Sequence, residues 1–215
     1  MTAGTIDYLK DVKVYGGGTG SFAVTRYTED DIPYFKKHFE LWTKSRESCY
    51  EIGGRAPNLC DGFTEGLFCL HTGSVRYLSL TPEQRKKKEY KGFTEKIRKK
   101  DGTRETASLD TYNEESQEAE QIKSSIIDRD CSSFGPTSKQ DIVYFMHFYN
   151  DGKPLDGSFD LYKISNELLY NAVIRKDGTT FKQDQETGRR PHLGLIEQVI
   201  LPNNIKPIEE NVKLW

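Results

Sequence analysis

The chain has 215 residues, of which 35% are hydrophobic and 12% aromatic, and its formal net charge is −2. This length allows one sizeable core but not two large domains, so we expect one domain with an appended arm, as a monomer or a small homo-oligomer. The longest apolar stretch, Ile142–Phe148, is far shorter than the roughly 20 residues of a membrane span, and no signal-peptide core follows the polar start. The sequence therefore predicts a cytoplasmic protein.

The cysteines and histidines do not form a zinc motif. Four cysteines and four histidines lie far apart, without the CxxC, HxH or HExxH spacing that structural or catalytic zinc needs. This spacing predicts reduced thiols.

Positive charge is concentrated in one segment. Residues 85–100 hold nine basic and two acidic side chains, a local charge of +7, so the rest of the chain carries −9. Such a run is either a solvated connector or an arm that contacts phosphates.

The first part of the chain reads as mainly helical. A glycine cluster, Gly16–Gly20, lacks the Lys-Ser/Thr of a phosphate-binding loop and predicts a flexible turn. An acidic helix start at residues 28–31 is followed by Ile32, Phe35, Phe39 and Trp42 at helical spacing. A second helix is predicted over residues 62–70.

The second half predicts a mixed α/β sheet. We expect a hairpin with strands at 106–112 and 118–127, a central strand at 141–149 covered on both faces, and a strand at 158–164. Short helices are predicted to follow Ser165 and Thr180, and a last strand is predicted over 192–200.

Two strands of this hairpin carry a candidate metal site. Asp110 lies on the first strand, and Gln121 and Lys123 lie two apart on one face of the second, which is the Asp…(Glu/Gln)-x-Lys pattern. Asp110 and the carbonyl of Ile122 would bind Mg²⁺, and Lys123 would orient or help deprotonate the attacking water. Gln121 offers an amide oxygen without charge, so we expect Glu65 on the second helix to assist. Strand alternation sends Glu118 and Glu120 to the other face.

By spacing alone this motif is weak, because an Asp about ten residues before Gln-x-Lys occurs by chance in many sequences. The alternative is a non-catalytic DNA-binding or assembly protein in which the Asp and the Lys form a surface ion pair.

Longer strings in the C-terminal half resemble a known family. The strings are Cys131–Ser138, Tyr144–Gly152, Asp156–Tyr162, Asn166–Asn171 and Gly188–Pro191 followed by Leu201–Pro207. They resemble small type II restriction endonucleases, among them the BisI-like enzymes, that cut GCNGC or its cytosine-methylated form. The similarity covers residues 107–207 and includes the glutamine variant at Gln121. It implies a PD-(D/E)xK core with a mixed central sheet flanked by helices.

The resemblance also implies that residues after this core read DNA. Basic and small polar side chains suited to phosphate or base contacts are Arg129, Ser132, Ser133, Thr137, Arg189 and Arg190. A plain helix C-terminus at the arginine pair and an ordinary turn at Gly135-Pro136 are the alternative interpretations.

The sequence thus predicts a helical region (1–82), a basic connector (83–104) and a nuclease core (105–215). We expect a Mg²⁺-dependent homodimer that cuts both strands of a near-palindromic double-stranded site. A nuclease that requires 5-methylcytosine is the nearest alternative.

Overall fold

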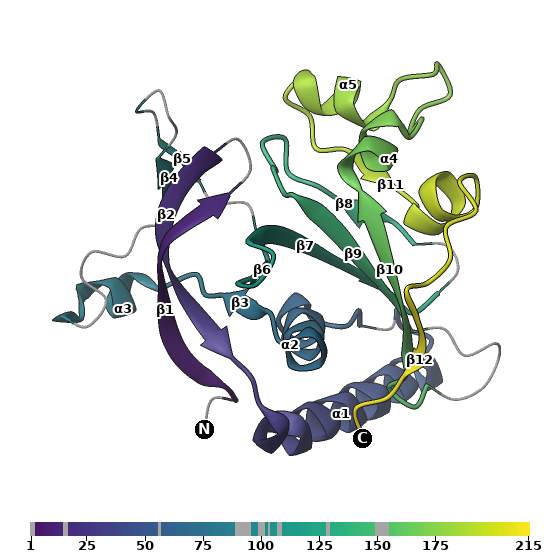
Figure 1. The fold of residues 1–215 in the computed structure, drawn as a ribbon. Helices are drawn as coiled ribbons and strands as arrows, with labels where there is room; N and C mark the ends of the chain where they lie inside the picture. Colours follow the sequence, from purple (N-terminus) through teal and green to yellow (C-terminus); the bar gives the residue numbers. More distant parts are fainter. Residues whose placement is uncertain are drawn as a thin grey trace.

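One mixed sheet runs through most of the chain (Figure 1). The computed structural model describes residues 3–14, 17–55, 57–88, 96–98, 102, 104–106, 109–127, 130–148 and 155–215. The ten strands of this sheet are β1 (Thr5–Val14), β2 (Gly18–Arg26), β3 (Val75–Tyr77), β4 (Lys96–Arg98), β5 (Arg104–Thr106), β6 (Thr111–Asn113), β7 (Glu118–Ser125), β9 (Ile142–His147), β10 (Phe159–Ser165) and β12 (Glu209–Val212). Their order is β12-β10-β9-β7-β6-β3-β2-β4-β5, with β1 paired to β2.

Helices pack around this sheet. They are α1 (Ile32–Glu51), α2 (Asp61–Thr72), α3 (Pro82–Lys86), α4 (Asn166–Asn171), α5 (Phe181–Glu186) and a helical turn at Ile196–Ile200. In Figure 1, α1 and α2 lie together below the central strands, and α4 and α5 lie above them. A short second sheet pairs β8 (Ser132–Ser133) with β11 (His192–Leu193). The predicted mixed α/β fold is confirmed.

Both predicted N-terminal helices are present. In α1, the apolar positions Phe35, Phe39 and Trp42 are 4–7% exposed and form its core stripe. In α2, Phe63 and Leu67 face the same core. This helix ends at Gly73, whose φ of 77° lies in the left-handed region that favours glycine.

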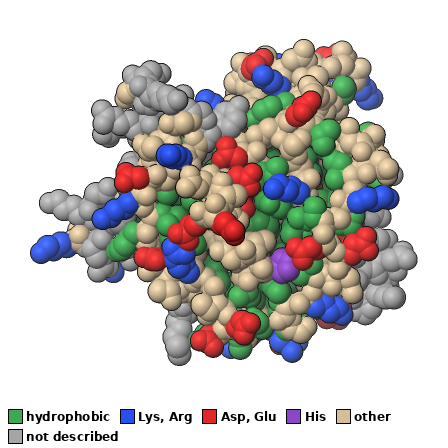
Figure 2. Space-filling model, viewed as in Figure 1, with side chains coloured by type: hydrophobic (Ala, Val, Ile, Leu, Met, Phe, Trp, Pro, Cys, Tyr) green, Lys and Arg blue, Asp and Glu red, His purple; other side chains and the backbone are tan. Residues whose placement is uncertain are grey.

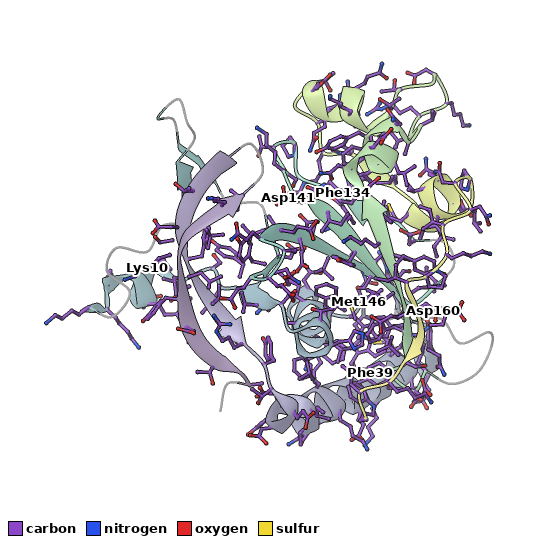
Figure 3. All side chains as sticks on the ribbon, in the orientation of Figure 1. Lys10, Phe39, Phe134, Asp141, Met146 and Asp160 are labelled. Carbon is purple, nitrogen blue, oxygen red and sulfur yellow. The ribbon has the colours of Figure 1, made fainter. Side chains whose placement is uncertain are left out.

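The centre of the sheet is the parallel pair β7 and β9, in register from Glu120 opposite Ile142 to Ser125 opposite His147. Val143 and Phe145 belong to the core cluster under α4 and α5, whereas Met146 belongs to the cluster around α1 and α2. Figure 3 shows Phe134 on the α4 side, and Met146 and Phe39 toward α1. The prediction that this strand is covered on both faces is confirmed.

The predicted hairpin exists, but its first strand is shorter than expected. β6 begins at Thr111, Asp110 lies in a bend before it, and Thr106 ends the separate strand β5. The turn between β6 and β7 spans residues 114–117.

The strand predicted over 192–200 is wrong beyond Leu193. The chain turns into the helical segment Ile196–Ile200 because the Asp130 carboxylate accepts hydrogen bonds from the backbone N–H groups of Leu195 and Ile196, at 2.8 and 3.0 Å. A side chain about 65 residues away therefore sets this local structure.

The first strands were not anticipated. The glycine cluster was expected to form only a turn, but Gly18 and Gly20 continue into β2, which pairs antiparallel with β1. β2 also joins β3 and β4, so strands from before, within and after the basic segment belong to one sheet. Part of the basic connector, including residues 89–95 and 99–101, lies outside the described residues. None of the described helices combines the length and apolar character needed to cross a bilayer.

Candidate active site

Asp110 lies where β6 separates from β7. Its backbone N–H donates to the carbonyl of Glu120 at 3.0 Å, and its carbonyl accepts from the N–H of Tyr77 at 2.9 Å. Carboxylate oxygen Oδ2 accepts from the backbone N–H of Ile122 at 2.9 Å and from the side-chain amide of Gln121. Among the described residues, no hydrogen bond reaches the other oxygen, Oδ1. The carboxylate is thus fixed against β7 with one oxygen available.

The backbone of Ile122 supports the predicted carbonyl ligand. Within a strand, the N–H and the C=O of one residue point toward the same edge. Because the N–H of Ile122 points to the Asp110 carboxylate, beyond the end of β6, its carbonyl is directed toward this same edge. Gln121 donates its amide nitrogen to Asp110, so its amide must turn over before its oxygen could bind a metal ion.

Lys123 extends from the same face of β7 as Gln121. Its ammonium lies 5.1 Å from the centre of the Phe134 ring, within cation–π range. Phe134 is 1% exposed and belongs to the core under α4 and α5, so it provides a rigid support. Burial raises the pKa of Asp110 and the charge of Lys123 opposes this shift, so the two groups share one neighbourhood.

Glu65 reaches this neighbourhood from α2. Its Oε2 accepts from Nε of Arg76 at 2.7 Å, and both side chains are largely buried. Arg76 lies on β3 directly opposite Thr111, the residue after Asp110. The ion pair therefore connects α2 to the part of the sheet that holds Asp110.

Burial raises the pKa of Asp110 to about 7, with the charges of Glu65 and Asp61 adding to the effect and Lys123 opposing it. Burial also raises the pKa of Glu65, although Arg76 opposes this shift. Two neighbouring carboxyl groups with raised pKa values repel each other when both are ionised. A cation placed between them therefore stabilises their charged forms.

The donor set fits a hard cation that takes oxygen ligands. Among the described residues, no group of three or more His, Cys, Asp or Glu side chains could hold a metal ion. Any ion at Asp110 would therefore need neutral oxygens, which the carbonyl of Ile122 and the amide of Gln121 can supply. On the face shown in Figure 2, acidic side chains gather near the centre, over the region where Figure 1 draws β6 and β7. A cation would offset this negative charge for a phosphate substrate.

The short sheet brings two predicted DNA-reading segments together. β8 pairs with β11, with Ser133 opposite His192, and the N–H of Phe134 donates to the carbonyl of Pro191 at 3.1 Å. Nη1 of Arg190 lies 3.5 Å from Oγ of Ser133. Since Phe134 also supports Lys123, this assembly adjoins the candidate active site.

The remaining residues predicted to contact DNA differ in their exposure to solvent. Thr137 is exposed, and the exposed Arg189 lies 3.8 Å from the buried carboxylate of Asp184. Ser132 is 7% exposed, and its hydroxyl donates to Asp130. Arg129 lies outside the described residues.

Three residues next to these sites were not anticipated: Asp61, Arg76 and Asp130. Asp61 lies four residues before Glu65, a spacing that puts both on one helix face and that the sequence could have revealed. Arg76 and Asp130 act through partners distant in sequence, for which the chain carries no local signal.

Comparison with known proteins identifies the family. The family model described as Bsp6I restriction endonuclease matches residues 27–202, which include α1, α2 and Glu65 as well as the strands of the candidate site. No curated protein and no solved structure matches the chain. The match spans most of the sequence, so the expectation of a DNA-cutting enzyme is confirmed. The chain belongs to the Bsp6I restriction endonuclease family and is a site-specific deoxyribonuclease.

Proposed function

We propose that this restriction endonuclease is a type II enzyme of the PD-(D/E)xK kind that hydrolyses double-stranded DNA at GCNGC with Mg²⁺. The observation that carries the proposal is the convergence of Asp110, Gln121 and the backbone of Ile122 at the edge where β6 leaves β7, with Lys123 beside them. Two copies of the chain would act on the two strands, because a two-fold protein meets a two-fold site most simply.

Each residue has a distinct task in this proposal. Asp110, the carbonyl of Ile122 and the amide oxygen of Gln121 would hold the metal ion, with Glu65 adding negative charge. A divalent ion supplies positive charge at the phosphate and lowers the pKa of bound water. Lys123, held over Phe134, would orient the attacking water and offset charge on the phosphate.

The side-chain amide of Gln121 would need to rotate so that its oxygen, instead of its nitrogen, faces the metal ion. The amide nitrogen of Gln121 donates to Asp110, which partly offsets the cost of burying that carboxylate. When the amide turns, Asp110 keeps the N–H of Ile122 as a fixed partner and so stays aligned.

Recognition is assigned to the assembly of β8 and β11. Arg190 and Ser133 present donors side by side, and Arg189 and Thr137 are exposed nearby in sequence. Arginine forks suit guanine O6 and N7, and short hydroxyls suit phosphate or base contacts. Ser132 is assigned to the same surface through its hydrogen bond to Asp130. Arg129, which lies outside the described residues, stays a predicted DNA contact from the sequence alone.

A methylation-dependent enzyme remains the alternative within this class, because one apolar contact to a cytosine methyl group could decide it. The non-catalytic binding protein is disfavoured by the family match.

The test is digestion of two matched plasmids, one unmethylated and one with 5-methylcytosine at every GCNGC site, each with Mg²⁺ and with chelator. We expect discrete fragments whose ends map to GCNGC, only with metal. Cutting of the methylated plasmid alone would establish the methylation-dependent alternative. Fragments that persist in chelator, or ends at another sequence, would contradict the proposed metal or the proposed site.

A further inference from the structure

A hollow of about 330 Å³ lies between the start of α1, the start of α2 and the N-terminal segment. Its lining is mostly aromatic and includes Tyr27, Tyr34, Phe35, His38, Cys60 and Phe63. The volume is at the lower end of the range for small-molecule sites, so the hollow suits a single planar ring system better than a large ligand.

The rings form a floor and walls. Phe35 and Phe63 are 6% and 4% exposed and form the floor. The ring of His38 stacks on Phe63, with centroids 5.2 Å apart and planes 22° apart, and Tyr27 meets Phe35 edge-on at 5.2 Å. At the edge of the His38 ring, Nε2 lies 3.5 Å from Sγ of Cys60, another lining residue. Flat apolar surfaces with hydrogen-bonding edges match the faces and edges of a nucleobase.

This hollow adjoins the candidate active site. Gly62 lines it, and a Cβ added there would lie 3.1 Å from Nη2 of Arg76. Tyr27 also lines it and hydrogen-bonds Arg76. Arg76 in turn binds Glu65 at 2.7 Å. One arginine thus forms a shared boundary between the aromatic hollow and the carboxylates proposed to cut DNA.

Side chains of both charges surround the hollow. Lys37 is exposed on α1, three residues after Tyr34 and so on the same side of the helix. Carboxylates lie there as well: Asp61 stands between the lining residues Cys60 and Gly62, and Glu29 and Asp30 are exposed before α1. Asp31 accepts hydrogen bonds from the backbone N–H groups of Gly4 and Thr28, which offset its charge.

We propose that this hollow receives a nucleobase turned out of the duplex next to the cut phosphate. The inference rests on the proposed function, because it needs the DNA to lie at Asp110. Stacking on aromatic rings accepts any base. The hollow therefore suits the central position of GCNGC, at which any base is allowed.

The test is a double-mutant cycle that compares DNA binding after removal of one aromatic side chain, after removal of one base, and after removal of both. The Asp110→Asn protein binds a duplex that carries the cut site mapped from the wild-type enzyme's own fragments. Tyr34→Ala is added to this background, and Tyr50→Ala serves as the matched control, because Tyr50 is an exposed tyrosine on the same helix outside the hollow. Binding is measured to the intact duplex and to duplexes with an abasic nucleotide at each position in turn.

We expect Tyr34→Ala to weaken binding of the intact duplex by roughly tenfold, and by less than about twofold when the extruded base is already missing. Tyr50→Ala should change neither. An equal loss on every duplex, or no loss on any, would overturn the proposal, and His38→Ala repeats the test if Tyr34→Ala does not fold. Cutting by the Asp110→Asn protein itself would instead refute the proposed catalytic site, so the two failures are distinct.

Discussion

Asp110 combines two properties that normally exclude each other. It is held by a backbone N–H and by an amide, which favour its charged form, yet burial raises its pKa to about 7. The folded chain therefore holds the proton of Asp110 more tightly than the unfolded chain, where the pKa is near 3.8. This carboxyl destabilises the fold as the pH rises from about 4 to about 7.

Replacing Asp110 by Asn should consequently stabilise the metal-free protein. Asn keeps an oxygen for the N–H of Ile122 and cannot ionise. In chelator above pH 7, we expect the free energy of unfolding to rise by roughly 1–4 kcal/mol, with the gain vanishing below about pH 4. Denaturant unfolding at both pH values checks this. A variant less stable than wild type at pH 8 would show that ionising Asp110 costs nothing.

Gln121→Glu should have the opposite effect without metal. A second carboxylate beside Asp110 would replace an amide donor by a like charge, so we expect a loss of roughly 1–4 kcal/mol at pH 8 in chelator. With Mg²⁺, the added charge should lower the metal concentration that gives half-maximal cutting. Thermal unfolding and a Mg²⁺ titration of cleavage test both parts, and an unchanged metal requirement would place Gln121 outside the ligand set.

At the scale of elements, the sequence predicted what depends on local periodicity. The apolar stripe of α1 could be predicted because it buries residues at the helical period. The strand β9 could be predicted because a strand covered on both faces is apolar along its whole length. Gln121 and Lys123 were placed on one strand face because side chains alternate along a strand. The bend at Asp110 and the helical turn after Leu195 depend on hydrogen bonds to other elements, so the local sequence pattern could not predict them.

The hydrogen bonds of Asp130 stabilise the region around β8 and β11, which is proposed to recognise DNA, and replacing Asp130 tests this role. Its carboxylate accepts from Leu195, Ile196 and Ser132, which ties the chain after β7 to the chain after β11. Asp130→Ala should lower the free energy of unfolding by roughly 1–3 kcal/mol, because the N–H groups of the buried Leu195 and the partly buried Ile196 lose their acceptor. It should also weaken specific DNA binding.

Asp160→Ala is the matched control. The carboxylate of Asp160, labelled in Figure 3, accepts from the N–H of Asn211 and so joins β10 to β12. Within the part of the chain that the structure describes, neither strand carries a predicted DNA contact. We expect a loss of stability without loss of specificity. Equal effects of both variants on specific binding would mean that Asp130 acts only through general stability.

At the scale of the molecule, one chain offers one candidate active site, whereas duplex cleavage needs two cuts. The same sheet connects the N-terminal strands to β6 and β7, which carry this site, so we expect one subunit to pair with a second copy and not to supply both cuts itself.

Mixing wild-type protein with an excess of the Asp110→Asn variant tests this pairing. Mixed dimers would hold one active and one inactive site, so we expect supercoiled plasmid to accumulate as nicked circles instead of linear DNA. Gel electrophoresis distinguishes the two products. If the mixture still yields linear DNA in proportion to the wild-type protein, each chain completes both cuts alone.

The most direct test of the account is cleavage of plasmid DNA by Asp110→Asn beside the wild type, with binding measured on the same preparations. We predict that the variant loses Mg²⁺-dependent cutting by at least about a thousandfold while it folds and binds the site as the wild type does. Cutting at the wild-type rate would contradict the assignment of Asp110, and with it the active site proposed at the edge between β6 and β7.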